Sequence, residues 1–386
     1  MGITEASSLD LKRVAYSPVS LFLMTNTFET GGSERQFAIL AQNLNPTRFQ
    51  LHFGCVSRRG AFAADFPTVP EFRLGGSLYG WQSLRTRLHL ARMLRRNRVQ
   101  IAHAFEFYTT LTMVPAARLA RVPVVIGSFR QLGDLLTPAQ FRVQTAAFRW
   151  CDVVVCNSHA GAARLAAAGL PWKKLLVIGN AMPQEMFAEA VPALPAWRDV
   201  LRVGMVARMN ARYKNHSGFL RIAALVREQV PNVEFLLAGD GPLRAELEEE
   251  ARSLGLGESV TFIGDRRDVP QVLASMDIAV LTSDSEGLSN VILEAMAGSR
   301  PVVAYDVGGN RELVNEKRGA LIAPGDEEGF AVAVVKLLQD SEYRRQCGAS
   351  ARLFVEQNFS LATVLQQYEE LYRSLLERKS SRSATA

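Results

Sequence analysis

The stretch SDSEGLSNVILEAMAGSRPVVA, residues 283–304, carries the local pattern from which the fold is inferred. A short apolar run, Ile278–Leu281, precedes it, and a second apolar run, Pro301–Ala304, closes it. Between them lies a polar loop, followed by apolar residues at helical spacing over Leu288–Ala297. Short, continuously apolar strands separated by helices are typical of a parallel sheet covered on both faces. This stretch therefore predicts a strand–helix–strand unit of an α/β protein.

The same alternation continues in both directions along the chain. Further expected strands are 20–25, 51–56, 101–103, 124–127, 153–156 and 176–178 in the first half, and 202–206, 233–238, 260–263 and 319–322 in the second. Helical patterns lie between them, including 34–44, 84–96, 217–228 and 243–253. About six units in each half predict an α/β fold of two doubly wound, Rossmann-like domains that face each other across a cleft.

A proline-containing stretch sets the expected domain boundary. AVPALPAW, residues 190–197, contains two prolines and suits a semi-stiff linker. We expect a first domain over residues 1–192 and a second over residues 193–360. A last helix, about 361–376, follows the strands of the second domain. The polar tail after it, residues 377–386, is expected to be disordered.

The composition fits a globular protein and excludes several other classes. The 386 residues are 48% hydrophobic and 21% charged, and no apolar run reaches the roughly 20 residues of a membrane span. The apolar stretch after Lys12 and Arg13 is interrupted by Pro18 and has no small-residue cleavage site after it. We therefore expect a first strand there rather than a signal peptide. Four scattered cysteines indicate reduced thiols in a core, not a disulfide scaffold or a zinc site.

The net charge of +6 is concentrated in the first half of the chain. Residues 1–196 carry 21 Lys and Arg against 11 Asp and Glu, whereas residues 197–386 carry 23 against 27. The stretch 85–98 contains six arginines and no acid, with apolar residues at helical spacing on one face. Its basic face is either solvated or rests on an anionic membrane surface. No nucleic-acid partner is expected, because no recognised motif accompanies these arginines and few aromatic residues lie among them.

The strongest candidate binding residues lie within the opening stretch. Glu286 is in the loop, Gly287 precedes the expected helix, and Glu294 lies one to two turns into it. A helix N-terminus offers free N–H groups and partial positive charge to a phosphate. Flanking carboxylates can accept hydrogen bonds from sugar or ribose hydroxyls. A simple cap, with Ser289 as the N-cap and both acids solvated, explains these residues equally well.

Cations follow a strand of the second half. VGMVARMNARYKNH, residues 203–216, places Arg208, Arg212 and Lys214 in a loop after the expected strand. Three cations at this position can neutralise a diphosphate leaving group, although any single arginine is more often a surface residue.

Glycines mark two further turns at the expected cleft. Gly239 lies in LLAGDGPLRAEL, residues 236–247, where a glycine lets a nucleotide approach the backbone; an ordinary strand–helix turn is an equally good explanation. Gly31 and Gly32 precede the helix of residues 34–44. Neither the Walker pattern nor the dinucleotide fingerprint is present there, but the pair can approach a phosphate or a sugar.

Together these four segments resemble the retaining nucleotide-sugar glycosyltransferases of family 4, which have the GT-B fold. The resemblance covers nearly the whole chain and includes VIGNAMPQEMF, residues 177–187, and FSLATVLQQYEELY, residues 359–372. Its most specific part is the E-x7-E pair, which Glu286 and Glu294 match. Arg208 and Lys214 match the family's Arg/Lys pair, with one extra residue between them; Arg212 is the alternative to Lys214.

The resemblance implies a role for each matched position. Glu294 would bind the ribose hydroxyls, and Glu286 would contact the donor sugar. Arg208 and Lys214 would hold the diphosphate and stabilise its departure. The last helix would pack back on the first domain. Further donor contacts would come from Gly31, Gly32, Gly239, Leu288, Ser289, Asn290 and Val291.

The chain departs from the family at one position. Many relatives carry a histidine after a first-domain strand that contacts the donor sugar, whereas this chain reads VVIGSFRQLG over residues 124–133. Three residues are the candidates for a first-domain sugar contact. They are Ser128 and Arg130 within this stretch, and His103 after the preceding strand.

The expected activity follows from the resemblance. A hexose or N-acetylhexosamine is transferred from a UDP- or GDP-linked sugar to a glycan or lipid-linked acceptor in cell-surface polysaccharide biosynthesis. No Asp-x-Asp pair stands at a strand end, so neither a metal nor another cofactor is expected. The alternatives are a nucleotide-sugar 2-epimerase of the same architecture and a non-catalytic nucleotide-sugar-binding protein. The expected location is the cytoplasm, with peripheral contact to the inner membrane leaflet.

Overall fold

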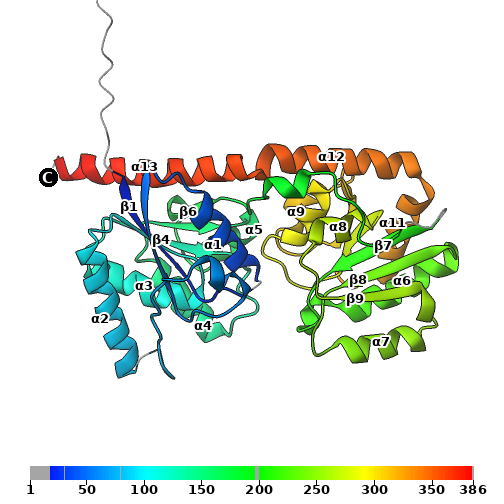
Figure 1. Ribbon diagram of the computed structural model, residues 1–386, viewed down its shortest axis with the longest axis horizontal. Coiled ribbons are helices and arrows are strands. Elements are labelled where there is room, and N and C mark those ends of the chain that lie inside the picture. The colour runs from blue at the N-terminus through cyan, green and yellow to red at the C-terminus, as the bar shows by residue number, and fades with distance from the viewer. Residues whose placement is uncertain (1–17, 30, 79, 196–199, 385–386) are drawn as a thin grey trace, which may run out of the picture.

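The computed structural model describes residues 18–29, 31–78, 80–195 and 200–384, which form two α/β domains side by side (Figure 1). Each described domain contains one six-stranded parallel sheet, in agreement with the predicted fold class. The first sheet comprises β1 Val19–Thr25, β2 Phe49–Cys55, β3 Ile101–Ala104, β4 Val124–Phe129, β5 Val153–Cys156 and β6 Leu175–Val177. The second comprises β7 Leu201–Val206, β8 Val233–Ala238, β9 Val260–Gly264, β10 Ile278–Leu281, β11 Val302–Tyr305 and β12 Gly319–Ile322.

Helices connect the strands and cover both faces of each sheet. Those of the first domain are α1 Gly32–Asn43, α2 Trp81–Arg96, α3 Phe107–Leu119, α4 Pro138–Phe148 and α5 His159–Ala167. The later helices are α6 His216–Gln229, α7 Arg244–Ser253, α8 Val269–Ala274, α9 Asn290–Ala297, α10 Asn310–Leu313, α11 Glu327–Gln339, α12 Ser341–Phe359 and α13 Leu361–Ala384.

The strand order places a switch point in each sheet. The first sheet runs β2-β1-β3-β4-β5-β6, so the order reverses between β1 and β3; the second runs β12-β11-β10-β7-β8-β9, with the reversal between β7 and β10. In open α/β sheets, ligands bind beyond the carboxyl ends of the strands at such a point. The loops after β1, β7 and β10 are therefore the ones that position a site.

Apolar packing explains why the two sheets are stable. In the first domain one sheet face packs against α1 and α13, and the other against α2, α3 and neighbouring helices. A single larger core surrounds the second sheet. All four cysteines are free thiols buried in these cores, as the scattered spacing predicted. Strand β1 forms within the apolar stretch that also resembled a signal peptide; Lys12 and Arg13 lie outside the described residues.

The C-terminal helix returns to the first domain and extends further than predicted. α12 lies along the second domain and α13 along the first (Figure 1), where Tyr368, Leu371 and Tyr372 of α13 enter the core. The expectation of a disordered tail is wrong as far as Ala384, because α13 continues through these polar residues. Lys379 Nζ lies 2.7 Å from Asp152 Oδ1, and this ion pair attaches the last turns to the first domain. Residues 385–386 lie outside the described structure.

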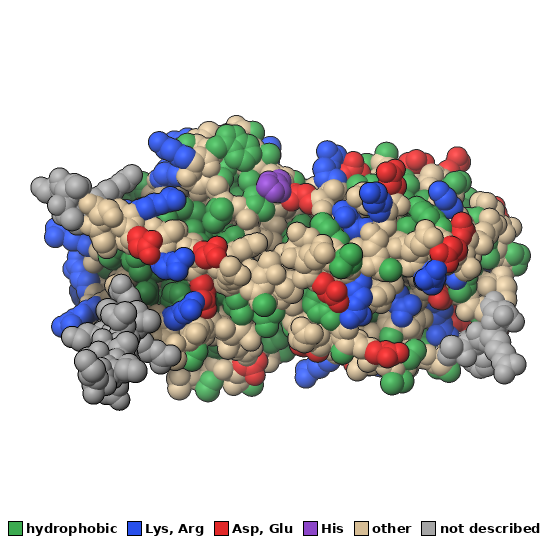
Figure 2. Space-filling view, turned by 90° about the horizontal axis from the view of Figure 1, so that it is seen from above, with side chains coloured by type: hydrophobic (Ala, Val, Ile, Leu, Met, Phe, Trp, Pro, Cys, Tyr) green, Lys and Arg blue, Asp and Glu red, His purple; other side chains and the backbone are tan. Residues whose placement is uncertain are grey.

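Helix α2 carries the arginine-rich stretch on the first domain. Leu90, Ala91 and Leu94 are buried against the sheet, whereas Arg92 and Arg96 are exposed. Lys and Arg side chains also gather at the first-domain end of the molecule, at the left of Figure 2, while acidic and basic side chains are mixed over the second domain. In the described part of the chain, no helix combines the length and apolar character needed to span a bilayer.

Candidate functional site

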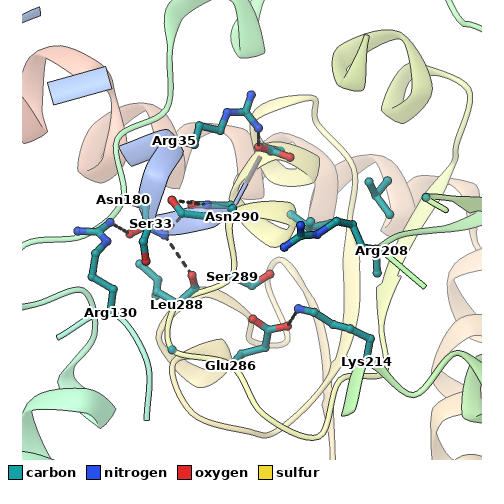
Figure 3. A pocket seen from close by; sticks show the side chains of 18 of the residues that line it. Ser33, Arg35, Arg130, Asn180, Arg208, Lys214, Glu286, Leu288, Ser289 and Asn290 are labelled. Atoms are coloured by element: carbon teal, nitrogen blue, oxygen red, sulfur yellow. Dashed lines mark hydrogen bonds and ion pairs between the residues drawn. The ribbon is translucent and has the colours of Figure 1, made fainter. Parts of the chain in front are cut away.

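A cavity of about 420 Å³ lies between the two domains, at the carboxyl ends of β1, β4, β7 and β10 (Figure 3). It brings together residues that are far apart in the sequence. Most of the predicted site residues line it: Gly31, Gly32, Arg130, Arg208, Lys214, Gly239, Glu286, Leu288, Ser289, Asn290, Val291 and Glu294.

Lys214 and Glu286 form an ion pair inside this cavity. The Lys214 ammonium lies 2.7 Å from Glu286 Oε1, and both side chains are largely buried. Backbone contacts fix the two loops against each other, because the Asp284 N–H donates to the Tyr213 carbonyl at 2.8 Å. The Thr282 hydroxyl also donates to the carbonyl of residue 215 at 2.8 Å. The β10 loop is thus held against the loop that follows β7.

The structure decides between the two candidate cations of the β7 loop. Residues Arg212–Lys214 form a single 3-10 turn, so the two side chains point in different directions. Arg212 is solvent-exposed and forms a two-point ion pair with Glu246 at 2.9 and 3.0 Å, outside the cavity. Lys214, not Arg212, is the cavity cation, in spite of the extra residue between it and Arg208.

Arg208 follows β7 and extends into the cavity without a partner (Figure 3). Among the residues that the structure describes, no hydrogen bond or ion pair involves its guanidinium. Its neighbours Lys214, Glu286 and Glu294 are already paired. A guanidinium presents a rigid fork of donors that matches a phosphate, so Arg208 is the side chain most available to an anionic ligand.

Glu294 is the buried carboxylate of the site. It lies on α9, whose N-cap is Ser289; the Ser289 Oγ accepts a hydrogen bond from the Ile292 N–H at 3.4 Å. The cap interpretation of Ser289 is therefore correct, but Glu294 is not solvated: its side chain is 4% exposed. Burial raises the pKa of the Glu294 carboxyl, and Arg35 opposes the shift through an ion pair of 2.5 Å.

Gly239 forms a tight turn for a structural reason. Its φ is +140°, and a Cβ there would come 2.0 Å from the Ala207 carbonyl oxygen. Only glycine accommodates this approach, which brings the turn after β8 against the start of the Arg208 loop. The structural interpretation of this turn is confirmed, and because the residue also lines the cavity, the approach of a nucleotide to its backbone stays a prediction.

A row of amide and guanidinium groups joins the domains at the cavity. Asn180 follows β6 and accepts a hydrogen bond from Arg130 Nη2 at 2.5 Å. Its own amide donates to the Leu288 carbonyl at 3.1 Å and to Asn290 Oδ1 at 2.6 Å. On the surface nearby, the Glu312 carboxylate of the second domain accepts the first N–H groups of α5 at 2.9 and 3.0 Å. These contacts hold the two halves of the cavity together.

His103 and Ser128 do not reach the cavity, which corrects the expectation of a sugar contact from either. Both are buried, and His103 Nε2 lies 2.7 Å from Ser128 Oγ while Nδ1 lies 2.9 Å from the Tyr372 hydroxyl of α13. Burial lowers the pKa of His103 to about 3, and Arg130 adds to the effect. His103 is a neutral core residue that binds the returning helix. Of the three candidates only Arg130 lines the cavity.

Two residues that link the domains at the cavity were not identified from the sequence. Arg35 and Asn180 line the cavity and form contacts between the domains. Asn180 lies within the family-like segment VIGNAMPQEMF, and Arg35 follows the Gly-Gly pair by three residues. Each therefore lay inside a segment that carries the family resemblance, but no local pattern distinguished it from its neighbours.

Replacing Gly287 by alanine is expected to lower kcat/KM by about 10- to 100-fold, since small misplacements of reacting groups carry costs of this order. A Cβ at Gly287 would lie 2.7 Å from the Arg130 carbonyl oxygen and would push the first domain away from Glu286. Gly257→Ala is the matched control, because a Cβ at Gly257 would meet nothing within 4 Å. Equal kinetic constants for both variants would contradict this role of the domain contact.

The fold and the cavity together define a class of protein. Two Rossmann-like domains enclose a cleft in which an E-x7-E pair, a free arginine and a helix N-terminus converge, which is the arrangement of a GT-B glycosyltransferase. Residues 200–340 match the family described as glycosyl transferases group 1, and residues 30–185 match glycosyltransferase family 4. The chain therefore belongs to the group 1 glycosyltransferases with the GT-B fold.

Individual relatives support the assignment. LpsE, a lipopolysaccharide core biosynthesis glycosyltransferase of Rhizobium meliloti (strain 1021), is 30% identical over 257 residues, 66% of this chain and 72% of LpsE. The putative glycosyltransferase EpsD of Bacillus subtilis (strain 168) is 30% identical over 165 residues; the match spans 42% of this chain and 43% of EpsD. The crystal structure of Anabaena HepE in complex with UDP has the same fold, with a TM-score of 0.80 at 23% identity over 92% of this chain and all of that one.

Proposed function

We propose that this protein transfers a hexose or N-acetylhexosamine from a UDP- or GDP-linked donor to a glycan or lipid-linked acceptor, with retention of the anomeric configuration. The observation that carries the proposal is the convergence of Arg208, Lys214, Glu286 and Glu294 on one cavity. The name of LpsE, which refers to lipopolysaccharide core synthesis, supports a polysaccharide acceptor.

The charges of the cavity suit a nucleoside diphosphate. Among the described lining residues, five are cationic and three are acidic, which leaves an excess of positive charge. We assign the diphosphate to Arg208 and Lys214, with backbone N–H groups at the start of α9 as further donors. Glu294 then accepts the ribose hydroxyls, and Glu286 accepts those of the donor sugar.

The chemistry assigned to these residues is positioning and charge stabilisation. Glu286 binds the sugar, so no protein nucleophile is assigned, and the acceptor hydroxyl attacks C1 on the face from which the diphosphate departs. The C1–O bond to phosphate breaks as the new C1–O bond forms, and a phosphate oxygen takes the acceptor proton. Arg208 and Lys214 stabilise the negative charge of the leaving group. Because these cations serve that role, the proposed reaction uses no metal ion or other cofactor.

A panel of nucleoside diphosphates and their sugars tests the proposed function. A ligand that binds only the folded state raises the unfolding temperature, so UDP or GDP should stabilise the protein where ADP does not. Transfer to a glycan acceptor, measured by product formation in the presence of EDTA, should follow for the matching sugar. Donor epimerisation without transfer would instead identify an epimerase, and binding with neither reaction a non-catalytic protein. No stabilisation by any nucleotide would contradict the proposal.

We further propose that the exposed face of α2 rests on the inner membrane leaflet, where a lipid-linked acceptor is presented. Arg92 and Arg96 have no partner among the described residues and lie beside the exposed Arg95. No acidic side chain occurs on α2, and exposed Trp81 begins it. Each cation close to an anionic surface contributes about 1 kcal/mol to binding.

Replacing Arg92 and Arg96 by glutamine should therefore weaken binding to anionic vesicles by roughly 30-fold, which corresponds to about 2 kcal/mol. Co-sedimentation with vesicles that contain an anionic phospholipid measures the effect. The charge-matched control replaces Arg267 and Lys317, which are exposed on the second domain. Unchanged sedimentation of the α2 variant, or an equal loss in the control, would refute this membrane surface.

A further inference from the structure

The Arg35–Glu294 ion pair is the charged link between the two domains inside the cavity. Arg35 belongs to α1 of the first domain, and its Nη1 lies 2.5 Å from Glu294 Oε1 on α9 of the second. The carboxylate is 4% exposed and the guanidinium 33%. Figure 3 shows the Arg35 side chain, with a dashed line that marks its ion pair. The pair thus joins the residue assigned to the ribose to a first-domain residue to which the sequence assigned no role.

The position of Arg35 is fixed by the helix that carries it. α1 begins at Gly32, and the Arg35 N–H donates to the Gly31 carbonyl at 3.0 Å. The next residue, Gln36, is buried and makes two hydrogen bonds with the backbone of Ala181, at 2.6 and 3.0 Å. These bonds attach the first turn of α1 to the segment after β6. Arg35 therefore approaches Glu294 only when the first domain is closed against the second.

The geometry allows Arg35 and a ribose to share Glu294. The ion pair is formed at Oε1, and a carboxylate has a second oxygen with further lone pairs for a hydroxyl donor. Burial of an unpaired carboxylate favours its neutral form, whereas a cation within hydrogen-bond distance favours the charged form. Within the described chain, Arg35 is the charged group that lowers the pKa of Glu294 and so favours its charged form. Arg208, Lys214 and Glu286 line the same cavity.

We propose that Arg35 is a positioning residue for the nucleotide: it orients the charged Glu294 toward the ribose and makes tight binding depend on closure of the two domains. The proposal rests on the proposed function, because it takes the ligand of Glu294 to be a nucleoside diphosphate. Arg35 acts through Glu294 and not on the reacting atoms. Its removal should therefore weaken nucleotide binding more than it lowers turnover with saturating donor.

Calorimetric titration of Arg35→Met with UDP or GDP, whichever stabilises the wild type, tests this role. We expect the dissociation constant to rise about tenfold, since a hydrogen bond to a charged group contributes on this scale. The KM for the donor should rise in parallel, with kcat changed by much less. Loss of Arg35 raises the pKa of Glu294 further, so fewer molecules carry the carboxylate as the pH falls. The ratio of variant to wild-type dissociation constants should therefore increase on acidification from about pH 8 to about pH 6.

Three further variants separate this role from a structural one. Arg35→Lys should restore much of the affinity, and Arg35→Met should have little effect when Glu294 is already glutamine. Arg48→Met removes an arginine paired with Glu369 at the surface of the same domain and should leave nucleotide binding unchanged. A variant Arg35→Met that binds the nucleotide as the wild type does, at both pH values, would overturn the inference. Failure of the wild type to bind any nucleotide would instead reject the proposed function.

Discussion

Arg208→Ala is expected to lower kcat by about 10²–10³-fold, the cost of removing one preorganised donor from a developing oxyanion. The reason is that this guanidinium is unpaired: Lys214, the other cation assigned to the diphosphate, forms an ion pair with Glu286, whereas Arg208 has no partner in the described residues. In the proposed reaction it faces the diphosphate as its negative charge grows. The substitution therefore removes an interaction that strengthens in the transition state, and kcat falls as well as kcat/KM.

Steady-state kinetics at saturating donor measure this effect. Arg212→Ala is the matched control, since Arg212 lies in the same loop but pairs with Glu246 at the surface. The control should retain activity within a factor of about two or three, because exposed ion pairs contribute about 1 kcal/mol or less. Wild-type turnover in Arg208→Ala would exclude Arg208 from charge stabilisation.

Glu294→Ala should raise the dissociation constant of the nucleoside diphosphate by about 100-fold. Two hydroxyl groups of the ribose would lose a charged acceptor, at about 1.5 kcal/mol or more each. The truncation also leaves Arg35 without its counter-ion. Glu294→Gln retains the shape and one acceptor oxygen, so its loss should be smaller.

Calorimetry on Glu294→Ala and Glu294→Gln provides the measurement, with unfolding temperatures to establish that both variants are folded. Glu246→Gln, in which a surface carboxylate is changed, serves as the control. Unaltered nucleotide affinity in Glu294→Ala would show that the ribose binds elsewhere. Equal losses in Glu294→Ala and in the control would point to a general effect of charge.

The sheets could be predicted because their strands are buried on both faces. β8, β10 and β12 lie where the continuous apolar runs placed them, and the helices between them follow the 3.6-residue period. The last turns of α13 were missed because polar residues give no helical period of their own. These turns continue a helix whose apolar first part packs in the core of the first domain. The ion pair between Lys379 and Asp152, a residue more than 200 positions earlier, stabilises them.

The site could be predicted only where one segment carries the information. Arg208 and Glu286 lie in loops that follow strands, and Glu294 lies on the helix after the second of these loops. All three belong to recognisable motifs, and the structure brings them to one cavity. Arg35 could not be identified in this way, because its partner Glu294 lies 259 residues away in the sequence. His103 shows the opposite error. Its position near the end of a strand is typical of a site residue, but α13 covers it, and its ring forms a hydrogen bond with Tyr372. Both outcomes depend on how the domains and the last helix pack, which local sequence does not encode.

A crystal structure of the protein with the nucleoside diphosphate that stabilises it most tests whether this cavity is the donor site. We expect the two phosphates between Arg208, Lys214 and the N-terminus of α9, and the ribose hydroxyls on Glu294. A nucleotide bound outside this cavity, with Glu286 and Glu294 facing solvent or each contacting a different ligand, would contradict it.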